Sequence, residues 1–409
     1  MNRGVVLSET SNLSVRHQWG KFFQGLFLFS TVIGLIVLGI LILTVVDKTF
    51  TLVAVTNKVD PATLADRPLE ELSAEELRQI LRDKLRPARL RTIERDMGPI
   101  AQMGEADLTA LIMAEIVKPT TRASYPLFQS LTRRAEIEAE IRKEYPDAQI
   151  YFKAWLSWDF LQRSMATNPD LAGVRQAIKG SLLIILITIL FAFPIGVGAA
   201  IYLEEYADKR NRINRILQTN IENLAGVPSI IYGILGLAVF VRALAPITSG
   251  AAFGMDAGSG RTILSGGLTM ALLVLPILII SSQEALRAVP NSLREASFAM
   301  GATRWQTIWH HVLPYALPGI LTGTILAVSR ALGETAPLIL VGASSLINKD
   351  PQSVFSFFTA LPFQIYNWTV RPQPEFRNIA AAAILVLLAV LLSLNATAIV
   401  LRNRLSKRL

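Results

Sequence analysis

The sequence contains no cysteine, only three histidines and few charged residues. The absence of cysteine excludes disulfide bonds, thiolate catalysis, iron–sulfur clusters and cysteine zinc sites. With only His17, His310 and His311 available, the composition also argues against a histidine metal cluster or a catalytic triad. Charged residues make up 17% of the 409 residues and hydrophobic residues 52%, whereas about a quarter of a soluble protein is charged. The composition therefore indicates an integral membrane protein that moves or recognises a ligand rather than one that makes or breaks bonds.

The net charge of +9 does not indicate a nucleic-acid-binding surface. Residues 47–178 hold 20 acidic and 19 basic side chains and are nearly neutral. The excess of basic residues lies instead in short segments beside apolar runs. This distribution is typical of the positive-inside rule, so the basic residues report membrane orientation and no nucleic-acid partner is expected.

Six apolar segments are long enough to cross a lipid bilayer as helices, which takes roughly 20 residues each. They lie at about 22–46, 180–203, 222–244, 263–282, 319–341 and 379–401. The first contains no charge and is followed by no cleavage site, so we expect an uncleaved anchor helix rather than a signal peptide. The short connecting segments carry fourteen basic residues on one side of the membrane and four on the other, which places both termini and the 284–318 loop in the cytoplasm.

Residues 47–178, between the first two spans, are polar and numerous enough to form a small extracytoplasmic domain. Its patterns are mostly helical: Ser73 and Glu76 form a capping box, and the helix that they open is expected to end before Pro87. The other predicted elements are helices at 105–117, 128–144 and 155–163 and a strand at 148–152. No motif assigns an activity to this insert. We interpret its aromatic cluster as packing or interfacial residues rather than a ligand site, the residues being Trp155, Trp158 and Phe160.

The 284–318 loop predicts a pair of short helices joined at Gly301, which suits a left-handed helix end. The expected caps and stops are Ser292 with Glu295, Thr303 with Gln306, and then Pro314 and Pro318 before the next span. Such a pair would form a rigid protrusion that fits a groove of a partner protein. The alternative is an ordinary amphipathic loop under the membrane.

Three short motifs of this loop lie at a recognisable spacing, namely Glu295-Ala296-Ser297, Gly301 and Leu313-Pro314. They resemble the EAA loop of ABC importer permeases, although Ser297 replaces an alanine and His311 an aliphatic residue of that pattern. The resemblance implies that the loop is a coupling helix that docks on an ATP-hydrolysing subunit. It also implies that Glu295, Ala296 and Gly301 take part in that coupling.

The chain has no G-x-x-x-x-G-K-[ST] loop to hold a nucleotide phosphate. We therefore expect no enzymatic activity and no cofactor or metal on this chain. ATP and its magnesium ion are expected on a separate ATPase subunit.

Two charged residues, Arg330 and Glu334, lie near the middle of the fifth apolar segment. An arginine at the bilayer centre costs about 2.5–3.5 kcal/mol on insertion scales, so it must face protein or water. A spacing of four residues places both side chains on one helix face, close enough to pair. The guanidinium carries a permanent charge and a planar fork of donors, which suit a tetrahedral oxyanion. We favour a role in an anion pathway over a buried ion pair that only fixes helix packing.

Two longer motifs are SRALGETAP at 329–337 and NLAGVPSIIYG at 223–233. They resemble the signatures of phosphate ABC transporter permeases, and the GETAP ending and the overall layout favour the PstA type over the PstC type. The likeness covers about 175–409. It implies phosphate import, with Arg330 and Glu334 on the phosphate pathway.

The resemblance implies an all-α integral membrane protein with six transmembrane helices. Residues 179–409 would be the five-helix type I ABC importer permease core with its coupling loop. Residues 1–46 would be the cytoplasmic N-terminus and anchor helix, and residues 47–178 a mostly helical periplasmic insert. The insert departs from the shorter family members, so its role is not inherited from them.

The expected assembly lies in the bacterial inner membrane and contains a paralogous PstC-type permease, a PstB-type ATPase dimer and a periplasmic phosphate-binding protein. Three alternatives compete with this interpretation. The chain could import another oxyanion, such as sulfate or molybdate. It could be a receptor that senses through residues 47–178, although the short cytoplasmic segments offer no output domain. The insert could also dock the binding protein or a regulator.

Overall fold

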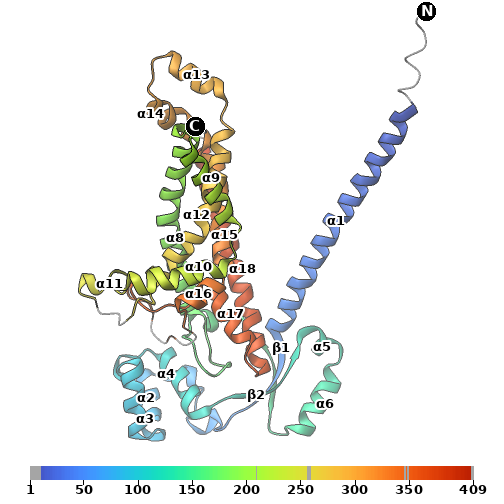
Figure 1. The fold of residues 1–409 in the computed structure, drawn as a ribbon. Helices are drawn as coiled ribbons and strands as arrows, with labels where there is room; N and C mark the ends of the chain where they lie inside the picture. Colours follow the sequence, from blue (N-terminus) through green and yellow to red (C-terminus); the bar gives the residue numbers. More distant parts are fainter. Residues whose placement is uncertain (1–10, 209, 256–258, 345–346, 348–349, 407–409) are drawn as a thin grey trace, which may run out of the picture.

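The computed structural model describes residues 11–208, 210–255, 259–344, 347 and 350–406. A helical bundle forms the body of the molecule, a small insert lies at one end of it, and a single long helix leaves at an angle (Figure 1). We call the end of the bundle near residues 284–318 the loop end and the opposite one the insert end. Some basic residues counted for orientation lie outside the described residues, namely Arg3, Lys209, Lys349, Lys407 and Arg408.

Within the described residues, five helices are long and apolar enough to cross a membrane. They are α1 (Ser11–Thr49), α8 (Arg175–Ile201), α12 (Ile263–Arg287), α15 (Leu313–Gly333) and α18 (Pro374–Ser406). The prediction of an integral membrane protein of mainly helical fold is therefore confirmed.

Helix α12 forms the centre of the bundle. In its most apolar stretch 67% of the residues are buried, whereas the corresponding share is 39% in α8 and 6% in α18. Small residues let its neighbours approach closely: a Cβ on Gly267 would lie 2.5 Å from Ile187 of α8, and one on Gly323 of α15 would lie 2.2 Å from Ser281. Close approach of this kind is how helices associate in lipid, where no hydrophobic force drives them together.

The predicted third span, 222–244, is wrong as a single helix. The structure has α9 (Arg212–Ala225) followed by α10 (Ser229–Gly236), which continues as a π-helix over Leu237–Ala243, and the two parts are bent by 106°. Pro228 has no backbone N–H and disfavours helical geometry at Val227, so the helix ends there. Counted as one bent span, the pair would bring the number of spans to six.

The ends predicted for the fifth span are also wrong. Pro314 and Pro318 do not separate the loop from the span, because α14 (Arg304–Thr307) runs through a π-helix at Ile308–Val312 directly into α15. Pro314 follows the π-helix directly and Pro318 lies within α15, so neither proline stops this continuous helix. At its other end α15 stops at Gly333, and the chain continues as the short helix α16 (Ala336–Val341).

The insert contains a three-stranded antiparallel sheet that the sequence analysis did not predict beyond one strand. The order is β2 (Thr120–Pro126), β1 (Phe50–Thr56), β3 (Gln149–Ala154), so the central strand follows α1 without a linker. Alternate residues of β1 serve two cores: Leu52 and Ala54 pack on α6, while Val53 and Val55 join a cluster that includes α18. The insert is thus joined to the last span by a shared hydrophobic core.

The insert also contains helices, and those before β2 pack into a separate apolar cluster. The Ser73 capping box is confirmed, and the predicted 105–117 helix is present with a π-helical end at Met113–Val117. The predicted 128–144 helix is two helices, because Arg133 between them leaves helical geometry at φ −128°. The helices of the insert are α2 (Ala74–Lys84), α3 (Pro87–Met97), α4 (Glu105–Ile112), α5 (Leu127–Thr132), α6 (Arg134–Glu144) and α7 (Trp158–Gln162), with short turns at Pro61–Thr63, Leu69–Glu71 and Ile100–Gln102.

Two of the three residues of the predicted aromatic cluster are packing residues. Trp155 is 3% exposed and its Nε1 donates to Thr51 Oγ1 at 2.7 Å, and Phe160 packs against Trp368 of α17 (Leu361–Thr369). Trp158 is 72% exposed. A further hydrogen bond of 2.8 Å, from Asn378 Nδ2 to Ser124 Oγ, ties α18 to β2.

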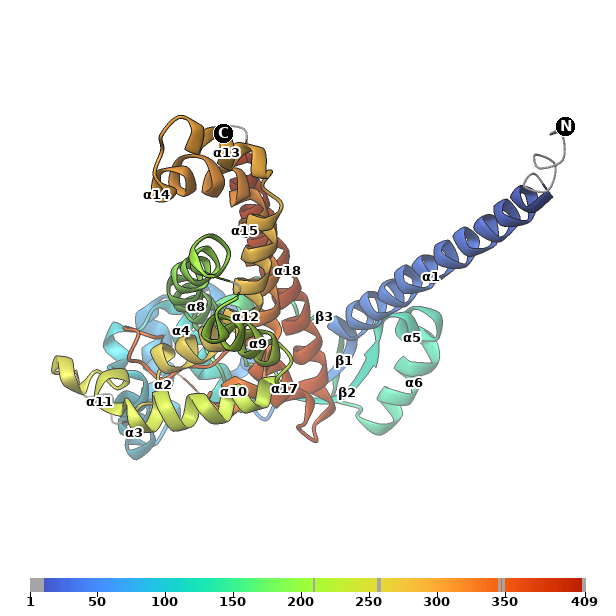
Figure 2. The same ribbon diagram turned by 45° about the horizontal axis from the view of Figure 1, so that its top comes forward.

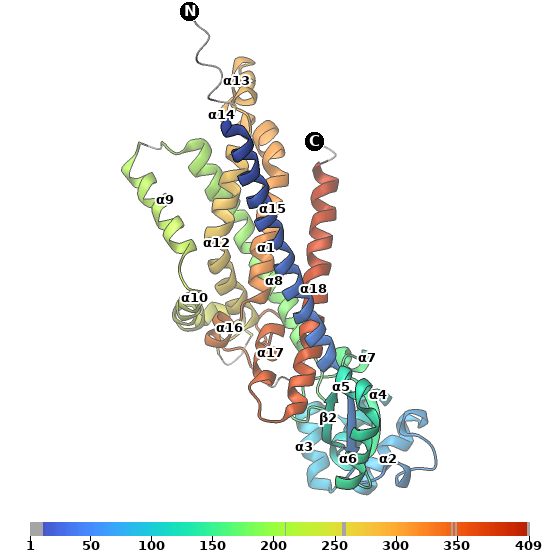
Figure 3. The same cartoon turned by 90° about the vertical axis from the view of Figure 1, so that its right-hand side faces the viewer.

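The remaining parts of the bundle are short. They are α11 (Ala245–Thr248), a turn at Ala251–Phe253 and the loop helix α13 (Asn291–Ala299). Helix α1 diverges from the bundle and exposes its apolar side chains along most of its length (Figure 2). Helices α9, α12, α15 and α18 run between the two ends of the bundle, with the insert below α18 (Figure 3).

Glu115→Gln tests how the helices of the insert are held together. Arg89 of α3 donates to both carboxylate oxygens of Glu115, at 2.6 and 3.1 Å, and these bonds lower the pKa of Glu115. A lowered folded-state pKa contributes stability above the unfolded pKa, and this is lost as the pH falls through the folded value. The pair is partly exposed, so we expect the local opening free energy to fall by about 0.5–1 kcal/mol at neutral pH.

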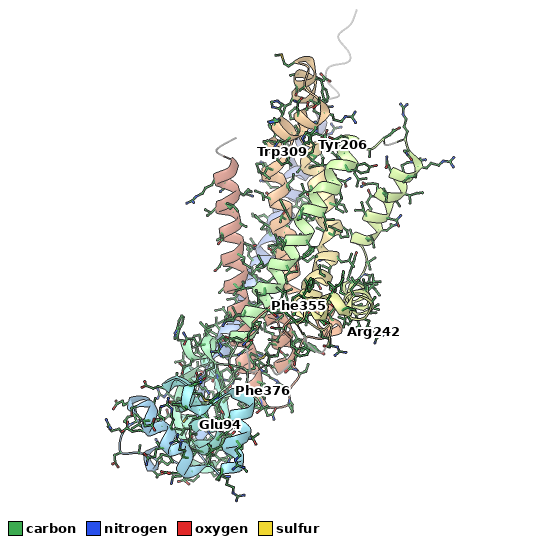
Figure 4. The ribbon with its side chains drawn as sticks, turned by 90° about the vertical axis from the view of Figure 1, so that its left-hand side faces the viewer. Glu94, Tyr206, Arg242, Trp309, Phe355 and Phe376 are labelled. Atoms are coloured by element: carbon green, nitrogen blue, oxygen red, sulfur yellow. The ribbon has the colours of Figure 1, made fainter. Side chains whose placement is uncertain are left out.

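Hydrogen exchange of α3 in the full chain measures this loss, which should shrink as the pH falls below about 4. Glu94→Gln, on an exposed residue of the same helix (Figure 4), is the matched control and should change nothing. An equal loss at neutral and acid pH would contradict the role of the carboxylate charge.

Candidate functional site

The two motif segments 223–233 and 329–337 meet at the insert end of the bundle. Each contains a break in a helix, between α9 and α10 in the first and between α15 and α16 in the second. Helices α10 and α16 lie side by side (Figure 1), and a Cβ on Gly233 would lie only 2.7 Å from Pro337 Cα. Non-helical backbone is tolerated at membrane depth only where protein or a water-filled cavity covers it. Broken helices that meet in a membrane protein are a usual place for a substrate site.

Arg330 and Glu334 lie at this junction. Arg330 occupies the last turn of α15, and Glu334 is the first residue after the helix, with φ −77° and ψ 128°. Arg330 Nε donates to Glu334 Oε1 at 3.4 Å, so the predicted pairing is confirmed. Their predicted position near the middle of a continuous helix is wrong, because the helix ends between them. A cation in the last turn also interacts favourably with the helix C-terminus.

The guanidinium of Arg330 is accessible. Its side chain is 50% exposed, whereas that of Glu334 is 20% exposed. Among the described residues Glu334 is its only hydrogen-bond partner, and the bond is long. A guanidinium has five N–H donors, so most of them are available to an oxyanion. Within the same described ranges, no three acidic or histidine side chains converge as metal ligands would.

Two further residues that were not assigned from the sequence lie at this junction. Tyr232 of α10 is 3% exposed and donates its hydroxyl to the carbonyl of Leu224 at 2.7 Å across the break. Asn395 of α18 lies 2.7 Å from the hydroxyl of Ser329, the residue before Arg330. Asn395 could have been found as a lone amide in the apolar run 379–401, and Tyr232 lies inside the quoted motif.

The second candidate site is the 284–318 loop at the other end of the bundle. Gly301 has φ +84° and ends α13 as predicted, and the Thr303 capping box opens α14. The predicted capping box at Ser292 is wrong, because α13 begins one residue earlier after Pro290 and leaves Ser292 in its first turn. The buried hydroxyls of Ser297 and Thr307 lie 2.9 Å apart and hold the two helices together.

The loop presents an exposed apolar surface. Glu295, Ala296 and Gly301 are all exposed. Around them lie large exposed side chains: Phe298, Met300, Trp305 and Trp309, the last two stacked with ring centres 5.5 Å apart. Figure 4 labels Trp309 and Tyr206 at this end of the bundle. Apolar side chains gathered on a protruding loop mark an interaction surface.

Both candidate sites lie within the part of the chain that matches a known family. Residues 192–409, more than half of the chain, match the family described as "binding-protein-dependent transport system inner membrane component". The chain is 32% identical over 266 residues to the probable ABC transporter permease protein YqgI of Bacillus subtilis, which covers 62% of this chain and 86% of that protein. It is 34% identical over 248 residues to the phosphate transport system permease protein PstA 1 of Mycobacterium tuberculosis, covering 60% and 75%. A solved bacterial alginate ABC transporter aligns at a TM-score of 0.45 and 16% identity, covering 78% of this chain and 98% of that one.

Gly233→Ala tests the close approach of the two broken helices. The new methyl group would lie 2.7 Å from Pro337 Cα and 2.9 Å from Leu340 Cδ1, so α10 and α16 must separate. We expect a destabilisation of about 1–3 kcal/mol, seen as a lower apparent melting temperature in detergent. Gly198→Ala in α8, where nothing lies within 4 Å, is the matched control and should melt like the unaltered chain. Equal melting of both variants would show that the two helices do not touch there.

Proposed function

The chain belongs to the family of binding-protein-dependent transport system inner membrane components, and we propose that it is the permease subunit of an ATP-driven importer of inorganic phosphate. As a permease subunit of an ABC transporter it is not itself an enzyme. The relatives named as phosphate permeases support phosphate as the cargo.

The observation that carries this proposal is the half-exposed Arg330 at the junction of two broken helices. Its single long hydrogen bond to Glu334 compensates the charge when no anion is present. Phosphate that enters the junction offers closer and stronger charge-assisted hydrogen bonds, since it presents several oxygens to the guanidinium fork. The hydrogen bond between Arg330 and Glu334 then breaks when the anion binds and forms again when the anion leaves.

The assembly follows from the family. An ABC permease works together with an ATPase and a binding protein, and the more specific composition is part of our proposal. It consists of a paralogous PstC-type permease, a PstB-type ATPase dimer that holds ATP and magnesium, and a periplasmic phosphate-binding protein. The basic residues beside the spans support a bacterial inner-membrane orientation with the loop end and both termini in the cytoplasm.

The loop end is where the ATPase would act. The exposed surface around Glu295, Ala296 and Gly301 would dock on the ATPase and leave water. Helices α12 and α15 are continuous with the loop through the chain, so a displacement of the loop reaches both. Arg330 lies at the far end of α15. This one helix therefore connects the ATPase-facing surface to the anion site. Binding of ATP would shift the equilibrium between outward-open and inward-open arrangements.

Arg330→Gln tests the anion site. Removing the charge should abolish phosphate uptake into vesicles that contain the whole complex, while membrane insertion and co-purification of the ATPase persist. Arg242→Gln is the matched control, since Arg242 is an exposed arginine further along the same bent span as α10 (Figure 4) and should be dispensable.

Competition by sulfate and molybdate in the same assay tests the cargo. Uptake of phosphate that is insensitive to both anions supports the proposal. Substantial uptake by the Arg330→Gln variant would remove Arg330 from the pathway, and preferential uptake of another oxyanion would overturn phosphate as the cargo.

Gly301→Val tests the coupling role of the loop. At φ +84° a β-branched residue is strained, so the turn between α13 and α14 must change shape. We expect ATP hydrolysis that no longer drives uptake, or loss of the ATPase on purification. Gly254→Val imposes the same strain, at φ +73°, on the insert end of the bundle, so normal coupling is expected for this control. Normal coupling in the Gly301→Val variant would exclude the coupling role.

A further inference from the structure

The π-helix that continues α8, Tyr202–Tyr206, makes an unusual set of contacts at the loop end. Three consecutive residues in it each meet an arginine from a different element. Consecutive helical residues project in different directions, which allows this. The pairs are Glu204 with Arg287 of α12, Glu205 with Arg294 of α13, and Tyr206 with Arg304 of α14. We call Glu204, Glu205 and Tyr206 the arginine socket.

The central contact of the socket is bidentate and largely buried. Arg294 donates to the two carboxylate oxygens of Glu205 at 2.7 and 3.3 Å, and the side chains are 17% and 10% exposed. The remaining donors of Arg294 reach the carbonyls of Val289, at 2.7 Å, and Leu286, at 2.9 Å. One guanidinium therefore joins the end of α8, the end of α12 and the loop helix α13.

The two flanking contacts bind the neighbouring elements to the same turn. Glu204, whose side chain is 6% exposed, accepts from Arg287 Nε at 2.9 Å. The guanidinium of Arg304 lies over the ring of Tyr206, 5.7 Å from its centre. An apolar cluster underneath, which includes Ala200, Leu203 and Val312, already packs these helices together. Burying an ion pair costs desolvation free energy, so these pairs add little to the stability that the apolar cluster already provides. Their directional geometry points instead to a role in keeping the three elements in register.

We infer that the arginine socket transmits the movement of the coupling loop to α8. This inference rests on the proposed function. Helices α12 and α15 are joined to the loop by the chain itself, whereas α8 is far from it in sequence and meets it through these side chains and through the apolar cluster beneath them. Glu205 and Tyr206 are thus positioning residues: they make α8 follow the loop, so that α8, α12 and α15 move as one unit when ATP binds.

Glu205→Gln tests the inference in the assembled complex. The chain has no cysteine, so a single cysteine at Leu190 of α8 or Leu326 of α15 can carry a spin label whose mobility reports that helix alone. In the unaltered complex ATP should change the label mobility at both positions. In the Glu205→Gln complex the ATP response at Leu190 should fall about tenfold, within the range of coupling factors, while the response at Leu326 persists.

Asp350→Asn is the matched control. It removes an ion pair with Arg175 at the other end of α8, at 3.2 Å, and should leave both responses unchanged. Should Glu205→Gln prevent assembly, Tyr206→Leu removes only the contact with Arg304 and is expected to lower the Leu190 response alone.

Responses that stay normal at both positions, or that are lost at both, would overturn the inference. The readout does not depend on the cargo, because it follows ATP and not phosphate. A complex with the expected label responses but no phosphate uptake would therefore refute the proposed cargo and leave the role of the socket supported.

Discussion

The guanidinium of Arg330 is a permanent charge in a lipid-spanning bundle, and the surrounding structure is organised around the need to compensate it. Arg330 lies in the last turn of α15, near the negative end of the helix dipole, and Glu334 provides a carboxylate. At the other break the carbonyl of Leu224 accepts from Val227 N–H at 3.1 Å and from the Tyr232 hydroxyl at 2.7 Å, which closes the end of α9. The charge of Arg330 and the two helix breaks therefore have the same requirement. Both need surroundings that exclude lipid and admit water or an anion.

The spans could be predicted from sequence because a run of about 20 mainly apolar residues is typical of a helix that crosses a bilayer. Their breaks could not be placed, because average hydropathy does not register Gly226-Val227-Pro228 or the end of α15 at Gly333. The strand β1 was missed for a different reason: it follows α1 directly, and its pairing with β2 and β3 depends on residues far along the chain. Gly301 was predicted correctly because a left-handed helix end is a local property. The cap predicted at Ser292 was wrong because α13 already begins at Asn291, directly after Pro290.

The pairing of Arg330 with Glu334 was predictable because a spacing of four residues is local geometry. The contributions of Tyr232 and Asn395 were not, because they depend on where α10 and α18 lie in space. The same holds for the arginine socket. Glu204 and Glu205 are separated from Arg294 by almost ninety residues, and only the packing of α8 along α12 brings them together.

The two ends of the bundle are held by different kinds of contact, and this difference bears on which parts can move. At the insert end, β1 shares a hydrophobic core with α18, and α1 enters β1 without a linker, so α1, the sheet and α18 form one body. At the loop end, directional ion pairs join α8 to α12 and α13. The two groups touch in more than one place, since Ala177 of α8 lies in the core that β1 and α18 share, and Ser329 of α15 contacts Asn395 of α18 one residue from Arg330. A relative movement of α15 and α18 would therefore change the surroundings of Arg330.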